Sequence, residues 1–203
     1  MKNQLVKNLE IQSRRRSFKK VILNDLIITV LTLIIFYLSL LITSMPLGAE
    51  KYETVNSAIE VLEQKGFDRE VFLLRRTATF RSGDNWLNTL TDKEKAYAAT
   101  NFPLGMMTLY PDFFSKTHDD TERAMILLHE AQHLKGGNEL EAYAFVWQNR
   151  HRLGWTQLSH GTTPTFITVE ELTREQLPQI FTCPEKLWDD CTEILYNQPQ
   201  AKR

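Results

Sequence analysis

The sequence predicts an α+β protein, in which an N-terminal transmembrane helix is followed by a small, mostly helical domain with a short sheet. The stretch from Leu26 to Gly48 contains no charged residue. Later in the chain, two segments combine helix-capping residues with apolar runs, whereas the run Gly105–Tyr110 has strand character. A chain of 203 residues is long enough for one folded domain beyond such an anchor.

The composition excludes several classes of protein. Lys and Arg number 24 against 25 for Asp and Glu, so the net charge is −1 and no nucleic-acid partner is expected. The hydrophobic content of 42% argues against a disordered chain. The 2 cysteines are too few for a disulfide-rich scaffold or a four-thiolate zinc site.

Residues 21–48 are predicted to form the transmembrane helix. About 20 apolar residues, each rising ~1.5 Å, match a hydrocarbon core of ~30 Å. Pro46 and Gly48 are expected to end the helix. A cleavable signal peptide is the alternative, but its apolar region is normally ~7–15 residues, and Leu47 stands where a small residue belongs.

Basic residues gather on one side of this apolar stretch, which predicts its orientation. The positive-inside rule keeps a basic segment, residues 1–20, in the cytoplasm and places residues 50–203 outside it. We therefore expect a single-pass membrane protein with an extracytoplasmic domain. The basic residues before the stretch are Lys2, Lys7, Arg14, Arg15, Arg16, Lys19 and Lys20.

The first part of the domain mixes predicted helices with a predicted strand. A helix is expected over residues 54–65, and residues 68–80 fit either a core helix or a buried strand. A short helix is expected from Thr91 to Ala99, because Thr91 or Asp92 can cap it and Glu94 follows. Gly105–Tyr110 is expected to be a strand.

The second part of the domain contains the best-defined helices. Residues 119–122 read Asp-Asp-Thr-Glu, a capping-box pattern that opens a helix ending before Gly136. Residues 138–141 read Asn-Glu-Leu-Glu, which opens a second helix to about Arg152. Thr165–Val169 is expected to be a strand, and the remainder two short helices.

The first of these helices carries the sequence His129-Glu-Ala-Gln-His133, an HExxH motif. Side chains four residues apart lie on one helix face, so both imidazoles can reach one metal ion. Glu130 projects beside them and can take a proton from a water that the metal activates. The motif therefore predicts a zinc site with Glu130 as the general base.

A third protein ligand is expected just beyond the helix, because catalytic zinc sites usually have three. The chain continues to Gly136 and Glu139, which completes HExxHxxGxxE. Gly136 allows the chain to turn back with a positive φ. Glu141 is an alternative ligand, but at the third helical position its natural partner is the backbone N–H of Asn138. Glu139 is therefore preferred, with Glu141 left open.

Residues 119–149 resemble the active-site segment of the zincin metallopeptidases. The spacing through Gly136 to Glu139 resembles that of metzincins, with Glu in place of their His, although no methionine follows residue 139 to form their Met-turn. The helix from Glu139 also resembles the Glu-x-x-Ala-Asp helix of gluzincins, with Tyr143 in place of the Asp. The resemblance implies a zincin-like domain over residues 50–203, a Zn²⁺ cofactor and peptide hydrolysis.

Two further roles are expected, of which the resemblance suggests the first. Zincins bind substrate along an edge strand before the signature helix, so Gly105–Tyr110 is either that strand or simply a core strand. A transition-state donor or second group around the metal is expected among Tyr143, His160 and Tyr110, and the sequence does not choose between them. His118 and His151 are weaker site candidates.

Cys183 and Cys191 are not expected to form a disulfide. Residues 184–195 read as one helix with Pro184 at its first position. Eight residues of helix separate the Cα atoms by ~12 Å, whereas a disulfide requires less than ~7 Å.

The leading hypothesis is a membrane-anchored zinc metallopeptidase that acts on a protein or peptide substrate. One alternative is a non-catalytic binding module with the same fold, which recruits a partner at the membrane. Another is a zinc hydrolase of a non-peptide amide. The intact Glu130 favours an enzyme, because a purely structural metal site does not need a base there.

Overall fold

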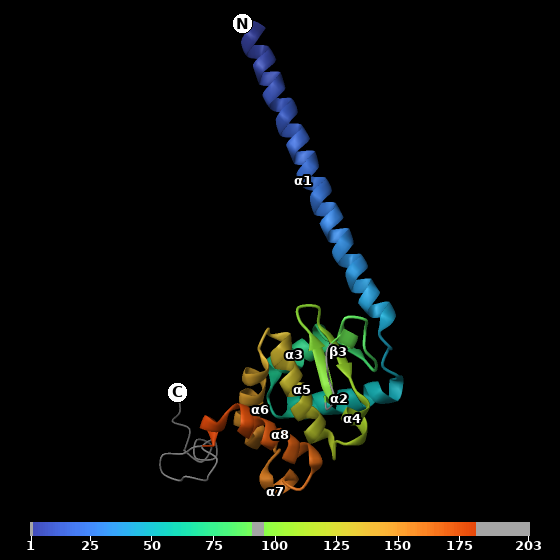
Figure 1. The fold of residues 1–203 in the computed structure, drawn as a ribbon, viewed down its shortest axis with the longest axis vertical. Coiled ribbons are helices and arrows are strands. Elements are labelled where there is room, and N and C mark those ends of the chain that lie inside the picture. Colours follow the sequence, from blue (N-terminus) through green and yellow to red (C-terminus); the bar gives the residue numbers. More distant parts are fainter. Residues whose placement is uncertain (1, 91–95, 182–203) are drawn as a thin grey trace.

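A long N-terminal helix, α1, extends from a compact mixed domain (Figure 1). The computed structural model describes residues 2–90 and 96–181, with side chains from Lys19 onward. Helix α1 runs without a break over Lys2–Thr43, so it includes the basic segment and ends earlier than the expected residue 48. Pro46 lies beyond it, in an isolated antiparallel bridge with Arg81.

Among the described residues, α1 is the helix that is long and apolar enough to cross a membrane, over Lys19–Thr43. Its most apolar window is only 6% buried inside the structure. A core helix of a soluble protein would bury most of this surface, because exposed apolar area costs roughly 25 cal/mol per Å². Within the described residues, most of the apolar surface of α1 is therefore not covered by the domain.

The rest of the described chain is mostly helical, and Figure 1 shows helices packed around a small sheet. The prediction that residues 54–65 are helical is confirmed, although the helix starts earlier. The ambiguous residues 68–80 form a helix and then a strand. The helices are α2 (Ala49–Gln64), α3 (Asp68–Arg76), α4 (Pro111–Ser115), α5 (Asp120–Leu134), α6 (Glu139–Leu153), α7 (Gln157–His160) and α8 (Pro164–Gln176), with 3₁₀ turns at Asn88–Leu90 and Pro178–Ile180.

In the described part of the chain, a three-stranded sheet has the order β1-β3-β2. Strand β1 (Thr79–Arg81) is parallel to β3 (Met106–Leu109), and β2 (Ala98–Asn101) is antiparallel to it. The strand expected at Gly105–Tyr110 is confirmed as β3. All four of its residues are buried and both its edges are paired, so it is a core strand and not an edge strand.

Two predicted elements are wrong. The helix expected from Thr91 to Ala99 does not extend to Ala99, because Ala98–Asn101 forms β2. Residues 91–95 lie outside the described residues. The strand expected at Thr165–Val169 is part of α8. Thr163 accepts a hydrogen bond from the N–H of Phe166, and Pro164 stands at the first helical turn. The Thr163 cap and Pro164 therefore outweigh the preference of the β-branched residues in this segment for a strand.

Helix α5 lies at the centre of the domain, in contact with α2, α3, α6 and β2. The run from Ala124 to Leu128 is wholly buried, which explains why it carries no polar face. Asp119 caps the helix by accepting from the N–H groups of Thr121 and Glu122. The predicted capping box does not close on Asp119, because the Glu122 carboxylate accepts from the N–H of His118 instead.

Candidate metal centre

The two histidines of the HExxH motif point into the same space from the last turns of α5. Their Nε2 atoms are 3.2 Å apart, and both side chains are mostly buried. The carbonyl of Gly137 lies 2.9 Å from Nδ1 of His133. Because a carbonyl only accepts, this contact places a proton on Nδ1, so Nε2 is the nitrogen of His133 that could bind a metal.

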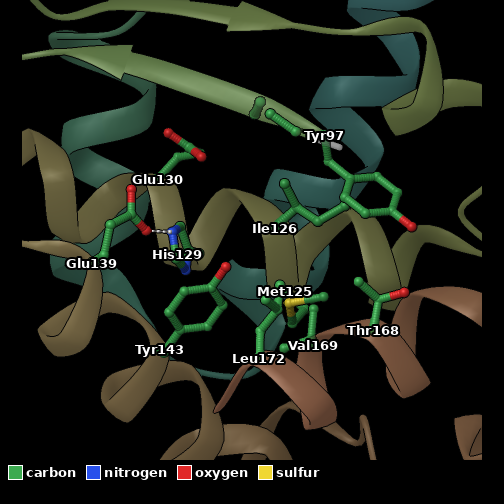
Figure 2. Close-up of a pocket in the computed structure, with 12 residues that line it drawn as sticks. Tyr97, Met125, Ile126, His129, Glu130, Glu139, Tyr143, Thr168, Val169 and Leu172 are labelled. Carbon is green, nitrogen blue, oxygen red and sulfur yellow. Dashed lines mark hydrogen bonds and ion pairs between the residues drawn. The ribbon is translucent and has the colours of Figure 1, made fainter. Parts of the chain in front are cut away.

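Glu139 reaches both imidazoles from the start of α6. Gly136 adopts φ +82°, which ends α5 and turns the chain back. Glu139 Oε2 then lies 3.1 Å from Nε2 of His129, and Oε1 lies 3.4 Å from Nε2 of His133. Figure 2 shows this carboxylate facing His129. The structure thus brings the three preferred ligands together.

Glu141, the alternative ligand, has a different partner. Its Oε2 accepts the N–H of Asn138 at 3.0 Å, and its own N–H donates to Oδ1 of Asn138 at 3.0 Å. This is a closed capping box, so the capping role predicted for Glu141 is confirmed. Its carboxylate is held at the start of α6 and not at the imidazoles.

The donor set fits zinc by distance and by chemistry. Ligand atoms held ~2.0–2.1 Å from a tetrahedral zinc are separated from one another by about 3.3 Å. The separations among the Nε2 atoms and the nearest Glu139 oxygens are 3.1, 3.2 and 3.4 Å. Two imidazoles and a carboxylate are also a usual catalytic zinc set, which leaves the fourth position open.

The electrostatics of the cluster favour a positive charge at its centre. Burial alone lowers the pKa of His133, but its hydrogen bond to Glu139 and the charge of Glu130 outweigh this and raise the pKa to about 9. Hydrogen bonds from His129 and His133 hold the pKa of Glu139 well below its usual range. A site that stabilises a proton between these groups also stabilises a cation there.

Glu130 lies beside the imidazoles, toward the sheet (Figure 2). It is 5% exposed, and its Oε2 accepts a 2.7 Å hydrogen bond from the hydroxyl of Thr100 in β2. One ligand atom from each of His129, Glu130 and His133 lies within 4.8 Å of the others. Thr100 was not identified from the sequence, because only the folded sheet brings it to α5.

Of the candidate donors named from the sequence, Tyr143 lies against the imidazole of His129. Its ring packs edge-on against His129, with centroids 4.7 Å apart. Burial, followed by the charges of Glu139 and Glu130, raises the pKa of Tyr143 to about 12. The phenol therefore keeps its proton at neutral pH and remains a hydrogen-bond donor.

The other predicted donors are bound to partners of their own. His160 is buried at the opposite end of α5, where its Nε2 is 3.1 Å from Oδ2 of the cap residue Asp119. Asp119 is ten residues before His129, or ~15 Å along a helix, so His160 is not a donor at the metal centre. The hydroxyl of Tyr110 donates to Asp84 at 2.7 Å and is engaged there.

An apolar pocket of about 150 Å³ adjoins the candidate metal centre (Figure 2). It is formed between β2, α5, α6 and α8, and His129, Glu130, Glu139 and Tyr143 make up one side of it. Neither His118 nor His151 lines it. Its remaining wall is mainly apolar: Ala96, Tyr97, Ala98, Met125, Ile126, Thr168, Val169 and Leu172.

Comparison with protein-family models, with curated proteins and with solved structures found no match to this chain.

Proposed function

We propose that this chain is a membrane-anchored, zinc-dependent metallopeptidase with a zincin-like domain. His129, His133 and Glu139 hold the zinc ion. The observation that carries the proposal is the convergence of these side chains. The two Nε2 atoms lie 3.2 Å apart, Oε2 of Glu139 is 3.1 Å from Nε2 of His129, and Oε1 is 3.4 Å from Nε2 of His133. When bound, zinc supplies Lewis-acid chemistry, polarising a carbonyl and lowering the pKa of water.

Glu130 is the general base. Thr100 holds one of its carboxylate oxygens at 2.7 Å, which fixes the side chain beside the imidazoles and leaves the other oxygen to handle protons. That oxygen takes a proton from the attacking water and gives it to the nitrogen of the leaving amine. The Tyr143 hydroxyl, still protonated, is placed to donate to the carbonyl oxygen as negative charge develops there.

The substrate is an extended polypeptide with an apolar side chain beside the scissile bond. Among the described residues, β2 pairs only with β3, so its outer edge can bind a peptide by strand addition. Ala98 of β2 also lines the pocket, which connects the strand to the apolar wall formed by Met125 and Val169. This wall matches a Leu-, Met- or Phe-sized side chain better than a charged one.

The domain is extracytoplasmic. Seven basic residues precede the apolar stretch of α1, whereas Lys51, close after it, lies between Glu50 and Glu53. We assign α1 as a retained anchor, because its apolar region is longer than that of a usual signal peptide.

The direct test uses the full chain, purified in detergent and supplied with zinc. It is incubated with a mixture of peptides that carry apolar residues, and cleavage is followed by mass spectrometry. The wild type should cleave, and Glu130→Gln should lose activity by ~10²–10⁴-fold while keeping its zinc. Glu141→Gln is the matched control and should remain active. Cleavage by Glu130→Gln at the wild-type rate would overturn the enzymatic proposal.

A further inference from the structure

The last turns of α1 are packed against the domain, through the loop that precedes the 3₁₀ turn at Asn88–Leu90. The indole Nε1 of Trp86 donates to Oγ of Ser39 at 3.1 Å, and the backbone N–H of Trp86 donates to Oγ1 of Thr43 at 3.3 Å. The rings of Phe36 and Trp86 meet edge-on, with centroids 5.8 Å apart, and Leu40 is fully buried. These contacts fix the orientation of the domain relative to α1.

The contacts of Tyr37 show which end of the sheet faces the apolar part of α1. Its hydroxyl lies 3.3 Å from Oγ1 of Thr79, the first residue of β1. Thr79 pairs with Met106, which follows the turn between β2 and β3. Tyr37 precedes the end of α1 by six residues, or ~9 Å of helix. This end of the sheet is therefore level with the last turns of the apolar stretch.

The turn between β2 and β3 exposes apolar side chains at this same end. Phe102 is 59% exposed and Leu104 half-buried, and Trp86 in the neighbouring loop is 41% exposed. Figure 1 shows this turn on the side of the domain from which α1 extends. Aromatic side chains of this kind favour the boundary between lipid and water.

We propose that Trp86, Phe102 and Leu104, which we call the apolar tip, contact the lipid bilayer at its headgroup level. Lipid is the expected partner of this surface because it lies next to α1. The α1 residues that contact the domain are the last ones of the apolar stretch proposed to span the membrane. Phe102 also packs over Gly136, with ring atoms 3.3–3.6 Å from where a Cβ would lie. Gly136 belongs to the turn that carries Glu139, so the metal centre lies close to the membrane surface.

This inference rests on α1 being a membrane anchor, as proposed above, but not on metal binding or catalysis. It is tested by spin labels on single cysteines in the full chain, with Cys183 and Cys191 replaced by serine, in nanodiscs of phosphatidylcholine and phosphatidylglycerol. The labelled variants are Phe102→Cys and Leu104→Cys at the tip and Leu33→Cys within the apolar stretch. Leu158→Cys is the control, because Leu158 is 98% exposed and lies in α7, at the far end of the domain in Figure 1.

The measurement is the collision rate of each label with oxygen, which partitions into lipid, relative to a water-soluble nickel chelate. We expect the ratio at 102 and 104 to lie between the high value at 33 and the low value at 158. If the ratios at positions 102 and 104 equal the low ratio at 158 while the ratio at 33 is high, α1 is an anchor but the apolar tip does not contact the bilayer. If 33 also matches 158, both the anchor and the tip are wrong, whereas the zinc site is unaffected.

Discussion

The hydroxyl of Thr100 donates a 2.7 Å hydrogen bond to Oε2 of Glu130, which joins edge strand β2 to the helix that carries both imidazoles. Glu130 is almost fully buried, so this partner also compensates for the loss of water around its carboxylate. The contact connects two parts of the proposed chemistry, since β2 is the strand expected to bind the peptide and Glu130 the group expected to move the proton.

Replacement of Thr100 by Val should therefore lower kcat by about 10-fold or more, because a hydrogen bond to a charged group is worth ~1.5–3 kcal/mol. KM and zinc content should change little, since Thr100 is neither one of the residues that line the pocket nor one of the proposed zinc ligands. Thr100→Ser keeps the hydroxyl and should retain most of the activity. Equal kcat values for Thr100→Val and the wild type would show that Glu130 needs no such support.

Glu139 and Glu141 give a matched pair for the third ligand. Glu139→Ala should weaken zinc binding strongly, because it removes one of the three proposed protein ligands. Glu141→Ala should keep zinc and lose ~1 kcal/mol of stability through the broken capping box. Zinc affinity is measured by competition with a chromophoric chelator. Loss of zinc in Glu141→Ala, with retention in Glu139→Ala, would reverse the assignment.

Tyr143→Phe separates packing from hydrogen bonding at the proposed metal centre. The remaining ring still fills the space beside His129, so the fold and the zinc content should be unchanged. Loss of the hydroxyl should lower kcat by up to ~10²-fold if it stabilises developing charge on the carbonyl oxygen. Peptide hydrolysis under single-turnover conditions checks this, and an unaffected chemical step would assign Tyr143 a packing role alone.

The cap of α5 predicts a pH-dependent stability. Burial raises the pKa of Asp119, but the N–H of Glu122 and the hydrogen bond to His160 outweigh it, and the net pKa is lowered. A lowered carboxyl pKa contributes stability above the unfolded value of ~3.9, which is lost as the pH falls through the folded value. Asp119→Ala should cost about 1 kcal/mol at neutral pH and less at pH ~3.

Denaturant unfolding of the full chain in detergent, followed by tryptophan fluorescence, measures this difference at the two pH values. Asp119→Asn, which keeps an oxygen that can accept from the N–H of Glu122, should be less destabilised than Asp119→Ala at neutral pH. A cost of Asp119→Ala that is the same at both pH values would contradict the account of the cap.

Helices and their ends could be predicted from local sequence because their caps are local. Asp119, Gly136 and Asn138 bond to backbone groups within a few residues of themselves. The same logic favoured Glu139 over Glu141, since Glu141 has a local partner and Glu139 does not. The convergence of His129, His133 and Glu139 could therefore be predicted without knowing the remaining fold.

What could not be predicted depends on contacts between distant segments. The two alanines of β2 favour a helix by themselves, and only pairing with β3 makes Ala98–Asn101 a strand. Thr100 meets Glu130 for the same reason. His160 was a candidate because it lies near a glycine in the sequence, yet its ring is bound to Asp119, which spacing along the chain could not reveal.

His129, His133 and Glu139 are the proposed zinc ligands, whereas Glu130 is not one of them. The most direct measurement is the zinc content of the purified full chain, by elemental analysis, for the wild type, His133→Ala and Glu130→Gln. We predict about one zinc per chain in the wild type and in Glu130→Gln, and none in His133→Ala. A wild type without zinc, or zinc lost in Glu130→Gln and kept in His133→Ala, would contradict this assignment of the ligands.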